Sequence, residues 1–372
     1  MFGVLVAAAF FVLRPTGSGD GDIVPGAWVE LPDSGLSGRT EASVVWTGRA
    51  MIVWGGNAEP GPTGDGAAFE LPAGTWAPLA RTPHSARRGH SAVWTGTKMI
   101  VFGGVGARGP LGDATAYDPA TNGWTALSPA PIEARSGHSA VWVQNRMLVW
   151  GGAGEGGRAL ADGASYDPAT DSWTVLPSSP LAARVAHRAV ATTHRMLVWG
   201  GSSEAQEGGR YFADGAVYSP ATNSWAPMAR APGVAARDNH AAVWTGEQLL
   251  VWGGYGRTDA CSPCFHGDGT AYDLDTDSWT PIAPSPLSGR GGHRAVWTGR
   301  EMLVWGGFDG AEQADGALYS PATDSWARLV PGPLPPRQHQ AMVWTGRQLL
   351  IWGGQGPAAK LADGAVLSLG AS

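Results

Sequence analysis

Short apolar stretches with alternating side chains recur along the whole chain, and each pair of stretches ends at two glycines. Residues 135–152, RSGHSAVWVQNRMLVWGG, show the pattern once, and the Gly-Gly pairs begin at positions 55, 103, 151, 200, 253, 306 and 353. Alternation with a period of two residues predicts β-strands. A unit that returns about every 50 residues is typical of a propeller. The pattern therefore predicts seven copies of one β unit.

Each copy contains four predicted strands, here named a, b, c and d in chain order. In the third copy, strand a is GHSAVW, strand b is MLVWGG, strand c is ADGASYD and strand d is SWTVL. A short polar turn such as residues 95–98 joins a to b and suits a tight hairpin. The phrase DPATDSW, or a variant, joins c to d, and its proline and Asp, Asn or Ser favour a turn. We expect four-stranded antiparallel blades.

All 19 tryptophans fall at three positions of this repeat, in strands a, b and d. Phe102 replaces tryptophan in strand b of the second copy, and Ala191 replaces it in strand a of the fourth. Large amphipathic rings at fixed positions suit packing between neighbouring blades. We therefore assign the tryptophans to the core and none to a special site.

The first predicted strand and the last copy complement each other. The stretch around Trp28 reads as a strand d without the other three, whereas the last copy has a, b and c but no d. Pairing the two would close the ring and leave no open sheet edge. The predicted fold is all-β, a seven-bladed β-propeller over residues 26–372 in which the N-terminal strand completes the last blade.

The repeat resembles the kelch repeat. Arginine, alternating apolar residues, Gly-Gly, a variable loop and YDPATN followed by tryptophan recur in register over residues 26–370, as in the kelch propeller of the galactose oxidase central domain. The resemblance implies a β-propeller. It also implies a function, because kelch propellers serve mostly as binding modules and in some members as sugar-active enzymes.

Charge narrows the classes of partner. The net charge is −6, and the only lysines are Lys98 and Lys360. No basic run could neutralise a phosphate backbone, so we expect no nucleic-acid partner. We expect the closed ring to be a monomer.

The N-terminus differs from the rest of the chain. Residues 1–13 are apolar but fewer than the ~20 residues that a membrane-spanning helix needs, and they resemble the apolar region of a signal peptide. Residues 14–25 read as a polar linker. We expect an exported or membrane-tethered protein, in the periplasm or outside the cell. The alternative is a cytosolic protein with an apolar N-terminus.

Strands alternate in direction, so the b–c and d–a connections should meet on one face of the disc. That face would collect an arginine at the head of every strand a, a histidine three residues later in five copies, and an aspartate before every strand c. An anion such as a carboxylate would suit such arginines. The alternative is that each arginine binds loop carbonyls or the neighbouring aspartate, and that each histidine satisfies a backbone group. The candidate ligand-binding residues of this set are Arg135, Arg184, Arg237, Arg290, His187, His240 and His293.

Two b–c loops break the sevenfold pattern, and loops on a rigid scaffold often carry recognition. Residues 202–213 end in Arg210, Tyr211 and Phe212, and residues 255–267 begin with Tyr255 and contain the only cysteines. We place a candidate binding site between blades 4 and 5 on this face.

The sequence lacks the motifs of most common catalytic sites. Cys261 and Cys264 form a C-x-x-C best explained by a local disulfide, although a metal or redox site is an alternative. Two G-x-G-x-x-G strings follow strands but open no helix. We expect no cofactor, no metal and no catalytic residue.

Three functions fit these observations. The first is a noncatalytic module that binds a protein or glycan ligand, which could be anionic. The second is an enzyme acting on an acidic sugar, of the mutarotase or epimerase type, and the third is a structural repeat protein of the cell envelope. We favour the first.

Overall fold

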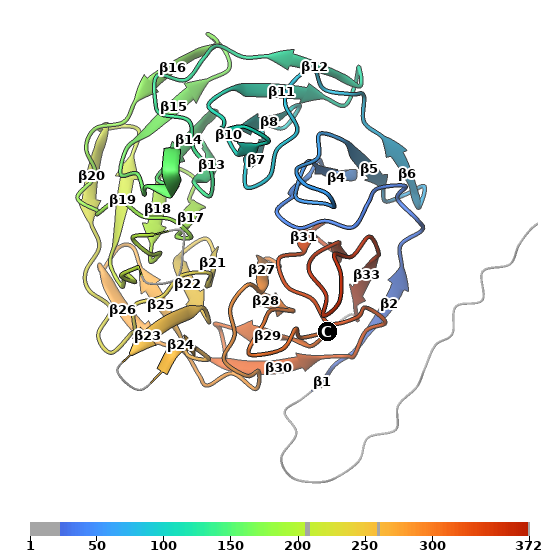
Figure 1. Ribbon diagram of the computed structural model, residues 1–372. Coiled ribbons are helices and arrows are strands. Elements are labelled where there is room, and N and C mark those ends of the chain that lie inside the picture. The colour runs from blue at the N-terminus through green and yellow to red at the C-terminus, as the bar shows by residue number, and fades with distance from the viewer. Residues whose placement is uncertain (1–22, 205–208, 259–260, 371–372) are drawn as a thin grey trace, which may run out of the picture.

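The computed structural model describes residues 23–204, 209–258 and 261–370. In this part of the chain, strands form seven four-stranded antiparallel blades around a central axis (Figure 1). The predicted all-β propeller is thus confirmed. The apolar segment 1–13 and most of the linker 14–25 lie outside the described residues.

The blades follow one another in chain order, and each runs from strand a at the axis to strand d at the rim. Blade 1 is β3 (Ser43–Trp46), β4 (Ala50–Trp54), β5 (Gly66–Glu70) and β6 (Thr75–Pro78); blade 2 is β7 (Ser91–Trp94), β8 (Met99–Phe102), β11 (Ala114–Asp118) and β12 (Gly123–Ala126). Blade 3 is β13 (Ser139–Val143), β14 (Arg146–Trp150), β15 (Gly163–Asp167) and β16 (Ser172–Val175); blade 4 is β17 (Arg188–Ala191), β18 (Met196–Trp199), β19 (Gly215–Ser219) and β20 (Ser224–Pro227). Blade 5 is β21 (Ala241–Trp244), β22 (Gln248–Trp252), β25 (Gly269–Asp273) and β26 (Ser278–Pro281); blade 6 is β27 (Arg294–Trp297), β28 (Met302–Trp305), β29 (Gly316–Ser320) and β30 (Ser325–Leu329).

Blade 7 joins the two ends of the chain. It consists of β31 (Ala341–Trp344), β32 (Gln348–Trp352), β33 (Gly364–Leu369) and the N-terminal β2 (Gly26–Glu30). β2 pairs antiparallel with β33 from Gly26 opposite Leu369 to Glu30 opposite Ala365. The ring therefore closes as expected, with the N-terminal strand supplying strand d of the last blade.

One short strand was not expected. β1 (Ile23–Val24) pairs in parallel with β30 of blade 6. Residues 23–24, at the end of the segment assigned as a linker, thus pair with the rim strand of blade 6. Two residues are too few to show a periodic pattern.

The core lies between the blades. The apolar residues of strand b are buried, and its tryptophans, such as Trp54 and Trp252, have no exposed surface. In six blades a glycine of strand c faces the b-strand tryptophan, and a Cβ atom at Gly66 would lie 2.9 Å from the Trp54 ring. In blade 2 the smaller Phe102 faces Ala114 instead. The pair is matched in size, as a close-packed interior requires.

Each d-strand tryptophan ties its blade to the blade before it. Trp124 Nε1 donates to the Ala80 carbonyl at 2.9 Å, and Trp279 Nε1 donates to the Ala229 carbonyl at 2.8 Å. The same bond recurs at Trp28, Trp76, Trp173, Trp225 and Trp326. The indoles therefore connect every neighbouring pair of blades, including blades 6 and 7 at the closure.

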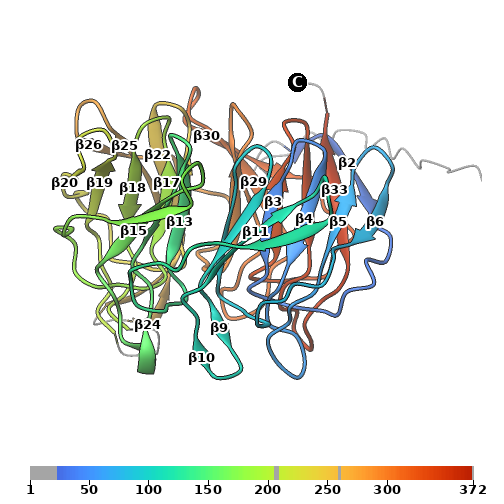
Figure 2. The same cartoon turned by 90° about the horizontal axis from the view of Figure 1, so that it is seen from above.

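The two faces of the disc differ. One, the turn face, carries the a–b and c–d turns, which are short and alike. The other, the loop face, carries the b–c and d–a connections, and from it projects the hairpin of β9 (Val105–Gly106) and β10 (Gly109–Pro110) (Figure 2). The hairpin of β23 (Tyr255–Thr258) and β24 (Cys261–Phe265) and the 3₁₀ turn η1 (Glu155–Gly157) are also b–c insertions. The uneven elements all belong to the loop face.

Candidate functional site

The seven repeated arginines are buried anchors. Arg237 donates from Nη1 to the Gly253 carbonyl at 3.1 Å and from Nη2 to both carboxylate oxygens of Asp268 at 2.9 and 2.8 Å. Each of the others makes the same type of contact with the first glycine of its Gly-Gly pair and the aspartate before strand c. The pairs are Arg39–Asp65, Arg87–Asp113, Arg135–Asp162, Arg184–Asp214, Arg290–Asp315 and Arg337–Asp363.

This burial decides what these arginines can do. Their side chains are at most 1% exposed, and guanidinium groups that are paired and out of solvent cannot grip a ligand. The structure thus places Arg135, Arg184, Arg237 and Arg290 as the sequence alternative has them, each bound to loop carbonyls and the neighbouring aspartate. They hold the loop of strands b and c against the head of strand a.

The repeated histidines fill the space between blades. The His187 ring packs edge-on against Trp150, and the His293 ring packs against Trp252, with centroids 5.1 and 4.9 Å apart. Gln340, which replaces histidine in blade 7, donates from Nε2 to the Trp305 carbonyl at 2.9 Å. The side chain at this position thus packs against the preceding blade, and in blade 7 it also bonds to that blade's backbone.

These histidines are neutral. Burial, together with the nearby arginine charges, lowers the pKa of His187 and of His293 to about 3. Burial also lowers the pKa of His240 well below its usual value. Because all three rings are enclosed, His187, His240 and His293 also have structural positions and are not exposed to a ligand.

The loop of blade 4 contributes less surface than its composition suggests. Phe212 is buried beneath the guanidinium of Arg184, 4.2 Å from its ring centroid, and Arg210 lies over the same ring at 5.6 Å. Arg210 is exposed and Tyr211 is half-buried. Of the three candidates here, Arg210 and Tyr211 remain accessible on the loop face.

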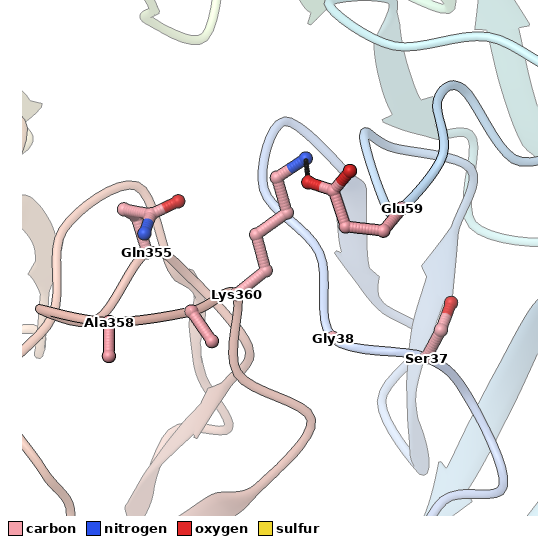
Figure 3. A pocket seen from close by; sticks show the side chains of 7 residues that line it. Ser37, Gly38, Glu59, Gln355, Ala358 and Lys360 are labelled. Atoms are coloured by element: carbon pink, nitrogen blue, oxygen red, sulfur yellow. Dashed lines mark ion pairs between the residues drawn. The ribbon is translucent and has the colours of Figure 1, made fainter.

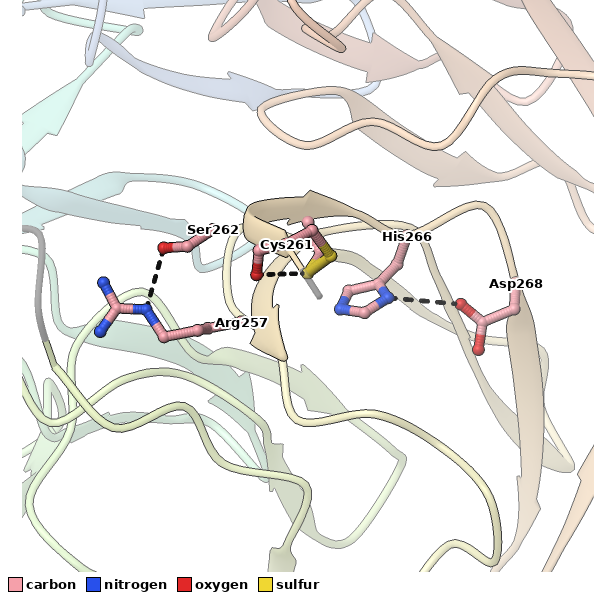
Figure 4. The surroundings of a disulfide bond; sticks show 6 residues. Arg257, Cys261, Ser262, His266 and Asp268 are labelled. Carbon is pink, nitrogen blue, oxygen red and sulfur yellow. Dashed lines mark hydrogen bonds and ion pairs between the residues drawn. A yellow bond between two sulfur atoms is a disulfide. The ribbon is translucent and has the colours of Figure 1, made fainter. Parts of the chain in front are cut away.

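The loop of blade 5 is the β23–β24 hairpin, and a disulfide joins Cys261 and Cys264 within its second strand, β24 (Figure 4). Arg257 Nε donates to Ser262 Oγ at 2.9 Å across the hairpin. At its base, His266 lies 3.9 Å from Asp268, the partner of Arg237. The hairpin is thereby attached to the repeated framework.

Three aromatic rings from the loops of blades 5 and 6 touch one another. The centroids of Tyr255 and Phe265 are 5.6 Å apart, and those of Phe265 and Phe308 are 5.9 Å apart. All three residues are half-buried. They form an aromatic cluster, defined here as Tyr255, Phe265 and Phe308, on the loop face.

A second variable set surrounds the axis. The residue two places after each buried arginine has a φ between 47° and 67°, and several of these residues bond to one another between blades, as Gly137 N does to the Gly89 carbonyl at 2.9 Å. This axial rim consists of Glu41, Gly89, Gly137, Ala186, Asn239, Gly292 and His339. The backbone is the same in every blade while the side chains differ.

Two arginines beside this rim were not predicted from the repeat. The residue that follows the histidine position is serine or alanine in five copies but arginine at Arg188 and Arg294. Both residues are half-buried at the start of an innermost strand, β17 and β27. Aligning the seven repeats shows arginine in place of serine or alanine at these two positions, and this signal could have identified Arg188 and Arg294.

The charges near the axis act on one another. Burial and the charge of Arg188 lower the pKa of Arg294 to about 9, against the opposing effect of Glu41. Burial, together with the charges of Arg294 and Arg188, lowers the pKa of His339 to about 3. Burial raises the pKa of Asp238, which accepts hydrogen bonds from Ser202 and Asn239. Arg188, Arg294, His339 and Asp238 are thus titratable groups near the axis that affect one another's charge and do not recur in every blade.

Comparison with known proteins assigns the family. The family model of the Attractin/LZTR1 β-propeller matches residues 65–317. This chain belongs to that family. Its kelch character is supported by a stretch of 108 residues that is 32% identical to Kelch domain-containing protein 3 from Bos taurus and covers 27% of this chain and 28% of that relative. The chain thus matches just over a quarter of the length of the curated relative.

A solved structure supports the fold of this Attractin/LZTR1-type propeller. The structure of YjhT superposes with a TM-score of 0.62 at 17% sequence identity, over 80% of this chain and 99% of that one. At this identity the likeness establishes the propeller architecture.

The propeller also has a cavity of about 520 Å³ on the loop face, where blades 7 and 1 meet (Figure 3). Lys360 spans it, with Nζ 2.9 Å from Glu59 and 3.2 Å from the Ala58 carbonyl. The rest of its wall comes from Ser37, Gly38, Gln355, Ala358 and Ala359. The cavity lies between the first and the last blade. Because Lys360 and Glu59 are paired with each other, it offers a ligand little unpaired charge.

Within residues 23–204, 209–258 and 261–370, no three or more His, Cys, Asp or Glu side chains gather closely enough to hold a metal ion. No helix in the same ranges is long and apolar enough to cross a membrane.

Proposed function

We propose that this propeller is a noncatalytic binding module that takes a protein ligand on its loop face, over blades 4 to 6. The observation that carries the proposal is the contrast between the two faces. The a–b turns repeat one hydrogen bond, as from Thr95 N to the Lys98 carbonyl and from Thr245 N to the Gln248 carbonyl. The b–c connections, in contrast, reach 16 residues in blade 5, between Trp252 and Gly269.

The side chains on this face support the same function. The aromatic cluster and the exposed Arg210 and Arg257 lie on the connections of blades 4 to 6. Aromatic residues and arginine are the types enriched where proteins bind one another. Kelch propellers generally mediate protein interactions, and the rigid blades would hold these loops in place.

Site-specific photocrosslinking tests the proposal, because it captures a partner whose identity need not be specified. A photoreactive amino acid replaces Arg210 or Arg257 on the loop face, and Thr97 or Glu247 on the turn face as matched controls, since all four are exposed. The full chain is irradiated in the cells that express it. We expect a discrete adduct from positions 210 and 257 but not from 97 and 247. Adducts from the turn face, or none from the loop face, would contradict the proposal.

We also propose that the protein acts outside the cytoplasm, because residues 1–13 resemble the apolar region of a signal peptide. Fractionation of cells expressing the full chain tests this. Recovery of the chain with cytoplasmic markers would overturn it.

A further inference from the structure

Arg188 and Arg294 are placed differently from every repeated arginine. At the same position, Ser91 and Ser139 bond to the histidine of the next blade, with Oγ to Nε2 distances of 2.7 Å to His138 and 2.8 Å to His187. The short serine side chain makes this bond between blades and extends no further toward the axis. The two arginines extend beyond what the repeat requires.

Each of the two arginines is anchored by one nitrogen. Arg188 Nε donates to the His240 carbonyl at 2.8 Å, and Arg294 Nε donates to the Gln340 carbonyl at 3.1 Å. The carbonyl belongs in each case to the following blade, so both side chains lean the same way around the axis. Within the described part of the chain, neither Arg188 nor Arg294 makes another hydrogen bond or an ion pair. The N–H groups of Nη1 and Nη2 are therefore available to a ligand, while the Nε bond fixes the position of each guanidinium.

The nearby carboxylates have other partners. Asp238 accepts from Ser202 Oγ at 2.9 Å and from Asn239 Nδ2 at 3.2 Å, and Glu41 pairs with Arg88 at 3.2 Å. Both act on the arginines through their charge, but neither comes within ion-pair distance of Arg188 or Arg294. Two half-buried positive charges thus lie close enough to lower the pKa of Arg294 without a direct counter-ion. Such a pair favours an anion that enters between or beside them.

We infer that Arg188 and Arg294 bind a carboxylate group of the ligand at the axial rim. The inference rests on the proposed function, since it names the chemical group that the loop face recognises. A carboxylate suits the planar fork of arginine, which can donate two parallel hydrogen bonds to its oxygens. The aromatic cluster lies on the neighbouring b–c loops, and Tyr255 is joined to Asp238 by backbone hydrogen bonds of 2.9 Å. A ligand could therefore place its carboxylate at the axis and its apolar part on the rings.

The carboxylate could belong to an acidic side chain of a protein or to a free sugar acid. Binding is measured by calorimetry on the full chain with two matched pairs of probes: a blocked glutamate peptide against its glutamine counterpart, and glucuronate against glucose. We expect the acid of a pair to bind and its neutral partner to bind at least about tenfold more weakly. Tighter binding of the peptide acid indicates a protein source, and tighter binding of glucuronate indicates a sugar source. Equal binding of acid and neutral probes, or no saturable binding of either acid, would overturn the inference.

The variants are Arg188→Gln and Arg294→Gln, with Arg146→Gln on the turn face as the control, since Arg146 pairs with Asp167 away from the axis. Each of the first two should weaken binding of the acid at least about tenfold, whereas the control should not. Arg188→Lys and Arg294→Lys keep the charge but lose the fork, so they give an intermediate loss and remain informative if the glutamine variants unfold. Unchanged affinity in the folded Arg188 and Arg294 variants would exclude the site.

The two proposals fail separately. If crosslinks form from positions 210 and 257 but no acid is preferred, the loop face binds its partner without a carboxylate at the axis. If an acid binds through Arg188 and Arg294 but crosslinks form only from the turn face, the carboxylate site is supported and the proposed function is contradicted.

Discussion

Arg237 holds both carboxylate oxygens of Asp268 with one nitrogen, although the arginine is fully buried and the aspartate side chain is 53% exposed. The repeat thus uses a charge from inside the ring to fix a carboxylate at the surface. The arginine–aspartate pair recurs in every blade, although the nitrogens that donate differ. This pairing explains why a charged phrase returns seven times in a chain with few charges.

Replacing Arg237 by methionine should cost about 3 kcal/mol in the free energy of unfolding, because the Gly253 carbonyl and Asp268 lose their donor. Asp268→Asn should lower the free energy of unfolding by less, because the Asp268 side chain is about half exposed to solvent. Urea unfolding of each variant measures both values. The exposed Arg257→Met is the matched control and should change stability little. An Arg237→Met variant as stable as the wild type would show that the pair does not tie the loop.

The Trp54–Gly66 pair should show energetic coupling. Gly66→Ala places a methyl group against the Trp54 ring and should cost roughly 1–3 kcal/mol through overpacking. In a Trp54→Phe background the same change should cost less, because blade 2 accommodates Phe102 with Ala114. A double-mutant cycle on unfolding free energies measures the coupling. Strict additivity would show that the glycine is present for another reason, such as the nearby Val53 carbonyl.

Stability should fall as the pH is lowered from 7 towards 3. Burial lowers the pKa of His293 from 6.5 to about 3, so the unfolded chain binds a proton in this window that the folded chain does not. At pH 5 each such histidine costs roughly 2 kcal/mol relative to pH 7. His293→Gln keeps a side chain that Gln340 shows to fit at this position, and it should reduce the acid sensitivity by about that amount.

The measurement for this prediction is the unfolding free energy of wild type and variant at pH 7 and pH 5. The exposed His194→Gln serves as the control. If His293→Gln and wild type lose the same stability on acidification, then the buried histidine is not the titrating group.

Trp124→Phe tests the bond between blades. It keeps most of the ring but removes the donor to the Ala80 carbonyl, at a cost of about 1 kcal/mol. Thermal unfolding should show a single transition at a lower temperature, since the bond joins two blades of one ring. A separate early transition would instead indicate that the blades unfold independently.

The ring could be predicted from sequence because its signals repeat. Seven Gly-Gly pairs, the strand alternation and the isolated strand around Trp28 together determine the blade count and the closure. β1 was missed because a two-residue parallel strand carries no period. The fold therefore followed from features that the blades share.

The site could be predicted only in part, because it lies where the blades differ. The position of the arginine ring was foreseen, but the pattern could not decide between a ligand and the aspartates as partners of Arg135 or Arg237. Burial decides it. Arg188 and Arg294 were not predicted because they do not recur: each replaces the serine or alanine of the other copies.

The pairing of β2 with β33 also determines how the protein can be displayed. Gly26 lies opposite Leu369, and Gly370 N donates to the Pro25 carbonyl at 2.8 Å, so both ends of the propeller leave from neighbouring points. The end of β33 lies on the turn face, away from the β9–β10 hairpin (Figure 2). A surface or a fused domain attached after β33 would therefore lie on the turn-face side of the disc. The loop face would point outward, free to meet whatever approaches.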